Sequence, residues 1–171
     1  MNACASIESL KDTEELMEQY PFVYGAFGIH PDDAEKMTEE TLEEIRQLSR
    51  LPKAVAIGEI GLDYYWHKEE HEHEIQKKMF LAQMEIAREE KLPFMVQSRD
   101  AAKDTLDLVK DCMKGGMYGG IIHCFSYGKE MAREYLDMGL YLGIGGVVTF
   151  KNAKKLKDCL LYTSPSPRDT R

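Results

Sequence analysis

Five residues whose side chains can do chemistry stand at or just after short apolar runs of this chain: His30, Glu59, Gln97, Arg99 and His123. Imidazole and carboxylate groups bind divalent metal ions and transfer protons, and a guanidinium grips phosphate or carboxylate with two hydrogen bonds. Because the carboxyl ends of parallel strands share one face, groups at these positions converge from distant parts of the sequence. The pattern therefore predicts one site at that face, with Glu59 as a metal ligand or an acid–base group.

The elements that must position these residues alternate along the chain. Apolar runs predict strands at about 22–28, 54–58, 93–97, 119–123 and 140–148. The polar segments between them have helical periodicity, and Thr38 is the expected N-cap of one helix. Strands that are apolar on both faces and alternate with helices predict a parallel sheet covered by helices, either doubly wound or closed as a barrel.

Composition limits the function classes. The chain has 171 residues, 43% hydrophobic and 30% charged, which predicts one soluble domain. A formal net charge of -8 argues against nucleic-acid binding through a broad basic surface, so a phosphate substrate would need a metal ion. Four well-separated cysteines predict free thiols in a reducing cytoplasm, and no apolar run approaches the roughly 18 residues of a membrane span.

Several motifs resemble those of one family, the TatD-like metal-dependent hydrolases of the amidohydrolase-like barrel group, often described as deoxyribonucleases. "GIHPDDA" resembles the family's G-[IV]-H-P motif, and "AIGEIGLDYY" resembles G-E-x-G-L-D-[YF]. "LPFMVQSRDA", "IIHCFS" and "GGVVTFKNA" resemble three later segments. Together these matches extend over about residues 3 to 157.

The resemblance implies a TIM-type (β/α)₈ barrel, here incomplete and lacking the first two strands and the last. It implies two divalent ions (Mg, Mn or Zn) and carries metal-ligand roles to Glu59, also the catalytic residue, and His123. Gln97 stands where the family has histidine, and it is a doubtful ligand because an amide oxygen binds such ions more weakly. The family's H-x-H pair is missing before Glu59.

The resemblance also divides the chain. Residues 1–159 correspond to the partial barrel. The segment "LLYTSPSPRDTR" over 160–171 resembles a translated sequencing adapter, and we expect it to be a non-native, disordered tail.

Three further residues, His30, Arg99 and Asp63, are expected to bind substrate or to support the metal ligands. The alternative for Arg99 is a structural ion pair with Asp63 or Asp100. His123 could be a core histidine, and Glu59 could cap a neighbouring segment or pair with Arg99. The histidines of "HKEEHEHE" are expected to form only a solvated helix start.

The expected function is 3′-to-5′ hydrolysis of DNA phosphodiesters, at single strands or ends, by metal-activated water. We expect this activity to be impaired in a chain without the first ligands. One alternative is hydrolysis of a D-aminoacyl ester or another small amide or ester on the same barrel. The other is a non-catalytic fragment whose open sheet edges invite aggregation or pairing. The oligomeric state is not predicted.

Overall fold

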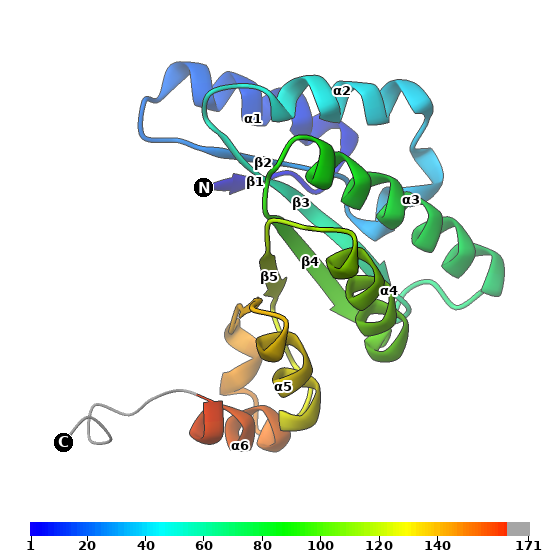
Figure 1. Ribbon diagram of the computed structural model, residues 1–171, viewed down its shortest axis with the longest axis vertical. Coiled ribbons are helices and arrows are strands. Elements are labelled where there is room, and N and C mark those ends of the chain that lie inside the picture. The colour runs from blue at the N-terminus through cyan, green and yellow to red at the C-terminus, as the bar shows by residue number, and fades with distance from the viewer. Residues whose placement is uncertain (164–171) are drawn as a thin grey trace.

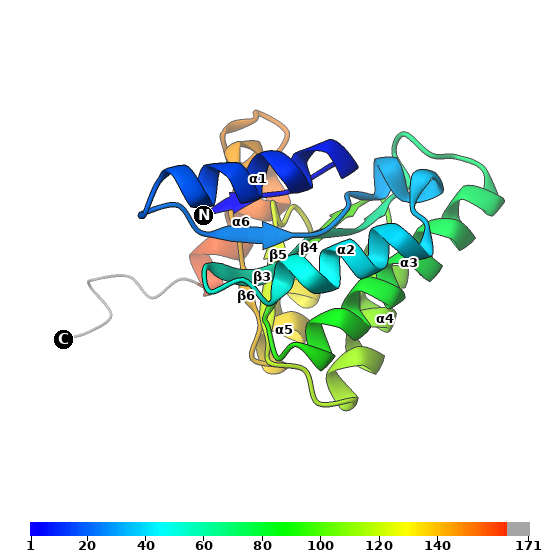
Figure 2. The same ribbon diagram turned by 90° about the horizontal axis from the view of Figure 1, so that it is seen from above.

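The computed structural model describes residues 1–163 of the chain. Its strands form one parallel sheet in the sequence order β1 to β6. Figure 1 labels β1 to β5, and β6 is labelled in Figure 2. The strands are β1 (Asn2–Ala3), β2 (Gly25–Phe27), β3 (Ala54–Asp63), β4 (Phe94–Arg99), β5 (Gly120–His123) and β6 (Tyr141–Leu142). This strand order is that of a barrel, and it excludes the doubly wound alternative.

A helix follows each strand and lies outside the sheet, so the helices form an arc around it (Figures 1 and 2). The α-helices are α1 (Ile7–Gln19), α2 (Glu39–Ser49), α3 (Glu70–Glu89), α4 (Ala102–Lys114), α5 (Lys129–Asp137) and α6 (Lys154–Thr163). Two short 3₁₀ helices, η1 (Pro31–Lys36) and η2 (Gly146–Thr149), follow β2 and β6. The Thr38 side chain accepts a hydrogen bond from the N–H of Thr41, which confirms the expected N-cap.

The structure corrects the expected strands in two places. β1 was not expected, because two residues beginning with Asn2 are too short for a periodic signal. The described part of the chain therefore has six parallel strands where five were expected, and the incomplete TIM-type barrel that the resemblance implies is confirmed. β6 has only two residues where 140–148 was expected, because the glycines at 143, 145 and 146 offer no side chains to pack.

β3 is the longest strand, and it differs from the expected range of 54–58. It continues to Asp63 after a register shift between Ile57 and Ile60, so Glu59 lies within the strand and not at its end. Gly61 has a φ of 141°, and a Cβ there would stand 1.9 Å from the carbonyl oxygen of Gln97. The absence of a side chain at Gly61 therefore allows the neighbouring strand β4 to approach closely.

One apolar core joins the strands to the helices that cover them. Phe80 and Met84 of α3 belong to it, together with Phe27, Ile60 and Phe94 from three strands. No helix of residues 1–163 is long and apolar enough to cross a membrane. Helix α6 ends at Thr163, inside the segment expected to be a foreign tail. The rest of that segment, 164–171, lies outside the described residues, so this expectation stays a prediction.

Candidate functional site

The structure brings the five expected residues together around one cavity of about 550 Å³ at the carboxyl edge of the sheet. Its lining includes His30, Glu59, Gln97, Arg99 and His123. These residues come from β3, β4, β5 and the end of the segment after β2. The parallel register explains the meeting, because Gln97 pairs with Gly61 on one side and with His123 on the other. The convergence predicted from the strand ends is confirmed.

Glu59 and His123 are the two metal-capable groups that face each other in this cavity. The Oε1 atom of Glu59 lies 3.9 Å from Nε2 of His123. The backbone N–H of Glu59 donates to the carbonyl of Cys4 at 2.9 Å, which fixes the part of β3 where the register shifts, between Ile57 and Ile60. A carboxylate and an imidazole at this separation suit a cation held between them, whereas direct proton transfer would need a distance of about 2.6–3.2 Å.

The described residues do not complete a metal site. Within residues 1–163, no group of three or more His, Cys, Asp or Glu residues has an arrangement that could hold a metal ion. Glu59 and His123 supply two donors, whereas structural and catalytic zinc sites use three or four protein ligands. Gln97 is buried beside them, but its amide oxygen is a weaker donor than the imidazole expected from the family motif.

Arg99 and Asp63 form an ion pair, which was one of the alternatives for Arg99. Nη1 of Arg99 lies 3.3 Å from Oδ2 of Asp63, an oxygen that makes no hydrogen bond. Asp63 is fully buried, and its other oxygen accepts the N–H groups of Tyr65 at 2.9 Å and Trp66 at 3.3 Å. With no exposed surface of its own, Asp63 positions Arg99 and the following loop. The Arg99 side chain remains 45% exposed at the cavity.

His30 lies at the edge of the cavity and begins the 3₁₀ helix η1. Its N–H donates to the carbonyl of Ala5 at 3.1 Å, and its Nδ1 accepts the N–H of Asp32 at 3.3 Å. Pro31 at the first position of η1 supplies a pre-set φ and needs no hydrogen-bond partner. The side chain is mostly buried but lines the cavity, where it can contact a bound molecule.

Two buried glutamines of α3, which the sequence analysis missed, fix the backbone on both sides of the site. Gln76 accepts the N–H of Asp63 at 2.9 Å and donates to its carbonyl at 3.3 Å. Gln83 accepts the N–H of Ile29 at 2.7 Å and donates to the carbonyl of the same residue at 3.2 Å. Each side-chain amide thus supplies one acceptor and one donor to the backbone of a single residue, as a neighbouring strand would. The signal available in the sequence was a seven-residue spacing that places both on one helix face.

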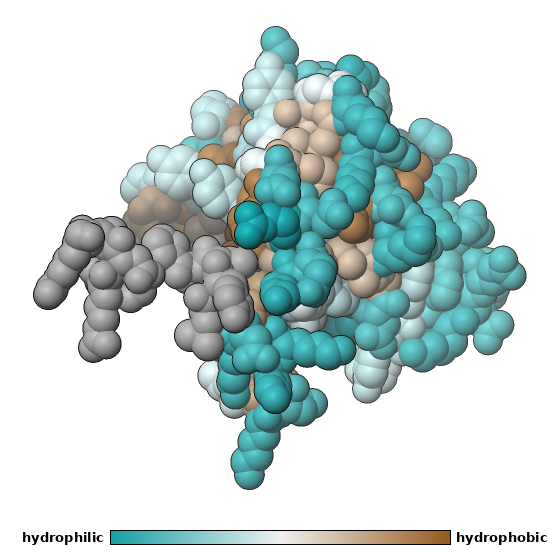
Figure 3. Space-filling model, turned by 60° about the horizontal axis from the view of Figure 1, so that its bottom comes forward, coloured by the Kyte–Doolittle hydropathy of each residue, from teal (hydrophilic) through white to brown (hydrophobic). Residues whose placement is uncertain are grey.

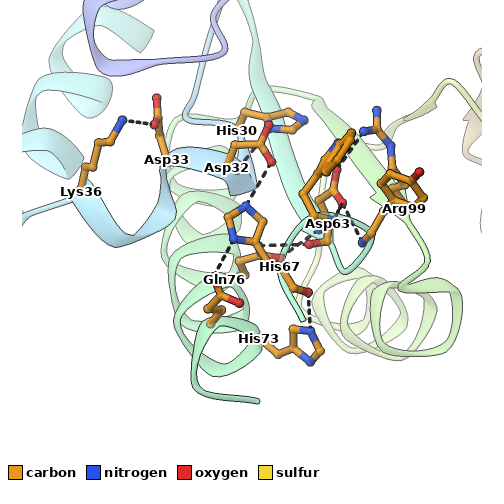
Figure 4. A network of polar contacts seen from close by, with 12 residues as sticks. His30, Asp32, Asp33, Lys36, Asp63, His67, His73, Gln76 and Arg99 are labelled. Atoms are coloured by element: carbon orange, nitrogen blue, oxygen red, sulfur yellow. Dashed lines mark hydrogen bonds and ion pairs between the residues drawn. The ribbon is translucent and has the colours of Figure 1, made fainter. Parts of the chain in front are cut away.

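A cluster around His67 corrects the expectation of a merely solvated helix start (Figure 4). His67 lies between Glu72 at 3.0 Å and Asp32 at 3.3 Å, and so joins the start of α3 to η1. Burial lowers the pKa of His67, but the hydrogen bonds to Glu72 and Asp32 outweigh it, so that the pKa is raised. His73 is half-buried and stacks on Tyr64. Only His71 is exposed as expected.

Cys124 is a further cavity residue that the sequence analysis did not single out. It follows His123 directly, with a φ of 47° that turns the chain at the end of β5. Burial raises the pKa of its thiol, and the negative charge of Glu59 adds to this effect. Both effects favour the protonated thiol when no cation is bound.

A parallel sheet in sequence order, with carboxylate, imidazole and guanidinium groups at its carboxyl edge, defines part of an α/β barrel that carries its chemistry at that edge. The chain belongs to the TatD related DNase family, whose model matches residues 1–168. This agrees with the resemblance seen in the motifs.

Individual relatives and solved structures support the family. The chain is 48% identical over 145 residues to "Uncharacterized metal-dependent hydrolase YabD" of Bacillus subtilis, matching 84% of this chain and 55% of the relative. It is 33% identical over 143 residues to "3'-5' ssDNA/RNA exonuclease TatD" of Citrobacter koseri, matching 84% and 54%. The crystal structure of YJJV, a TatD homologue from Escherichia coli K12, superposes with a TM-score of 0.83 at 29% identity, covering 92% of this chain and 60% of that one. The chain thus spans about half the length of the curated relatives it matches.

Proposed function

We propose that the protein is a metal-dependent hydrolase that cleaves phosphodiester bonds of single-stranded DNA from the 3′ end. The observation that carries the proposal is the cavity shared by Glu59, His123 and Arg99, at the sheet edge where barrels of this type hold their substrates. Membership of the TatD related DNase family supports the reaction class. The name of the Citrobacter koseri relative supports a nucleic-acid substrate. Because this chain spans about half of its relatives, the proposal concerns a complete barrel.

The proposed cofactor is a divalent cation, Mg²⁺, Mn²⁺ or Zn²⁺, with two such ions in the complete site. When bound, such an ion lowers the pKa of a water molecule and neutralises charge on the leaving oxygen. Within residues 1–163, Glu59 and His123 are the donors that face each other, and they do not fit a complete site. We therefore expect this chain by itself to bind a divalent ion weakly.

The remaining roles follow from charge and exposure. Arg99 is the proposed phosphate-binding residue, because Asp63 holds one of its nitrogens while much of the guanidinium stays open to the cavity. Glu59 is the proposed catalytic residue, and its carboxylate can accept a proton or hold a cation. His30 is proposed to contact the substrate from the side of η1.

A chimera tests the proposal. The part of the Bacillus subtilis relative that matches this chain over 145 residues is replaced by the corresponding residues of this chain. Release of nucleotides from a single-stranded oligodeoxynucleotide is measured with Mn²⁺ for the chimera, for Glu59→Gln and for Glu43→Gln. Glu59→Gln should lower the rate by about 100-fold or more, since residues that only support a ligand are worth about 10- to 100-fold. Glu43 is exposed on α2, so its variant should keep the full rate.

A second variant tests the metal-binding face. Gln97→His places another imidazole beside His123, and it should raise Mn²⁺ affinity in calorimetry and the hydrolysis rate by about 10-fold or more. If the chimera folds and cleaves a D-aminoacyl ester but leaves DNA intact, the substrate class is wrong. If it folds, binds Mn²⁺ and turns over neither substrate, the hydrolase proposal fails and the non-catalytic alternative replaces it.

A further inference from the structure

Two large aromatic side chains lie exposed in the loop between β3 and α3. Tyr65 is 48% exposed and Trp66 is 66% exposed. Their ring centroids are 4.6 Å apart with an angle of 87° between the planes, so each ring keeps a face that the other does not cover. Water contact of this much aromatic surface is unfavourable, and adjacent exposed aromatic residues mark binding surfaces.

The loop that carries these rings is held firmly. The buried carboxylate of Asp63 accepts the backbone N–H groups of both Tyr65 and Trp66. At the other side of the loop, Nζ of Lys68 donates to the carbonyl of Tyr64 at 2.9 Å, and the hydroxyl of Tyr64 donates to Asp104 on α4 at 2.9 Å. The exposure of the two rings is therefore a property of a loop fixed by its own backbone.

Positive charge lies beside the rings, although the chain is acidic as a whole. Nζ of Lys68 stands 5.2 Å from the centroid of the Tyr65 ring. Arg99 pairs with Asp63, the residue that caps the loop, and its half-exposed guanidinium lines the cavity. Cavity, guanidinium, buried carboxylate and aromatic loop thus form one continuous chain of contacts. Figure 4 shows Arg99 and Asp63 side by side.

We propose that Tyr65 and Trp66 form a stacking platform for the bases of single-stranded DNA, with Arg99 and Lys68 beside its phosphates. The proposal deepens the proposed function, and it rests on that function for the identity of the bound molecule. Exposed aromatic rings flanked by cations are the features that bind single strands, because every unpaired base offers a π-face. A duplex hides these faces. Glu69 and Glu70 follow the platform, so the attraction is local and the binding is weak and sensitive to salt.

The chain offers a direct probe, because Trp66 is its only tryptophan. The full chain is titrated with an eight-nucleotide oligo-dT in low salt and EDTA, and the fluorescence of Trp66 is recorded. An abasic strand of the same length supplies the same phosphates without bases. We expect the oligo-dT to quench the fluorescence and the abasic strand to leave it unchanged.

Variants are compared by the fluorescence anisotropy of a labelled oligo-dT. Trp66→Ala should weaken binding by at least about 5-fold, the lower end of measured base-stacking effects. Trp66→Phe retains a ring and should lose less. Tyr118→Ala is the matched control: Tyr118 is 58% exposed, but it precedes β5 and so lies toward the opposite edge of the sheet, and its loss should have no effect.

Three results would overturn the platform: no quenching by oligo-dT, equal quenching by the abasic strand, or an equal loss of affinity in Tyr118→Ala. These outcomes are separate from the hydrolase test, because binding is measured without metal ions. If oligo-dT quenches Trp66 but the chimera does not hydrolyse DNA, the stacking platform is supported and the proposed reaction is wrong. If the chimera hydrolyses DNA but oligo-dT does not change the fluorescence of Trp66, the proposed reaction is supported and the stacking platform is wrong.

Discussion

The sheet differs sharply between its middle and its later strands. Nearly all residues of β3 and β4 are buried, whereas β5 buries only Ile122, and neither residue of β6 is buried. Figure 3, which brings the α5–α6 end forward, shows apolar surface among the hydrophilic side chains, and Tyr141 of β6 is 73% exposed. β3 and β4 each have a strand on both sides, whereas β6 pairs within the described residues only with β5. β5 also has a strand on both sides, β4 and β6, so strand pairing alone does not bury a strand of this sheet.

The candidate site includes residues from both the well-buried and the more exposed strands. Glu59 and Gln97 lie on the well-packed pair β3 and β4, while His123 ends the more exposed β5. Glu59, one of the two proposed metal ligands, is therefore fixed by the core, and His123, the other, stands on a strand that is less buried. Local stability differs within folded proteins according to such packing.

The largest effect should come from a glycine in the well-packed pair. Gly61→Ala places a methyl group against the backbone of β4 at a φ that alanine avoids, and we expect a loss of about 3 kcal/mol or more in unfolding free energy, measured in urea. Gly146 in η2 has nothing within 4 Å of the position that a Cβ would take. Gly146→Ala should change the free energy by less than about 0.5 kcal/mol. Equal losses in the two variants would show that the contrast between the regions is wrong.

A matched pair of phenylalanines tests the same contrast through core packing. Phe94 of β4 is almost fully buried, and Phe94→Ala should cost about 3–5 kcal/mol by leaving a cavity. Phe150, which follows η2, is more than half exposed, so Phe150→Ala should cost less than about 0.5 kcal/mol. Thermal or urea unfolding measures both. A comparable cost at Phe150 would mean that the later region has a core of its own.

The glutamines of α3 should give an intermediate effect. Gln83→Met leaves the buried N–H and carbonyl of Ile29 without partners, so we expect a loss of about 1–3 kcal/mol. Gln47→Met on the exposed side of α2 is the control and should be nearly neutral. Denaturant titration gives both values. If Gln83→Met were as stable as the control, the hydrogen bonds from α3 to Ile29 would not be what fixes the backbone before His30.

The smallest effect concerns pH. The folded-state pKa of His67 is raised, chiefly by Glu72 and Asp32 against the effect of burial. The charged His67 should therefore stabilise the fold fully below its unfolded pKa of about 6.5, and this contribution should disappear as pH rises through the folded pKa. The difference in unfolding free energy between the wild type and His67→Asn should be below about 1 kcal/mol at pH 5.5 and smaller at pH 8.

Much of the fold could be predicted because its signals are local. Apolar runs marked five of the strands, and Thr38 with its following acids marked a helix start. β1 escaped because two residues carry no periodicity, and the end of β3 escaped because Glu59 interrupts the apolar run that continues beyond it. Such limits are set by long-range pairing, which a single sequence window does not contain.

The site was predictable in its position but only partly in its contacts. Strand ends converge by topology alone, so His30, Glu59, Gln97, Arg99 and His123 could be grouped without knowing any distance. The partner of Arg99 could not be chosen, because Asp63 and Asp100 are both within reach of a long side chain in sequence terms. Gln76 and Gln83 resemble ordinary surface residues of a charged helix, and only tertiary packing turns them inward.

Helix α3 also limits how the chain can vary in length. Gln76 and Gln83 are seven residues apart, so two turns of helix, about 10 Å, separate the backbone segments that they hold at Asp63 and Ile29. One inserted residue between them would rotate the second amide by about 100° and withdraw it from its partner. Insertions after Gln83, or in the connection from α3 to β4, would leave both contacts in place. Length variation tolerated by this fold should therefore fall outside 76–83, because that stretch of helix sets the spacing between the chain at the end of β3 and the chain after β2.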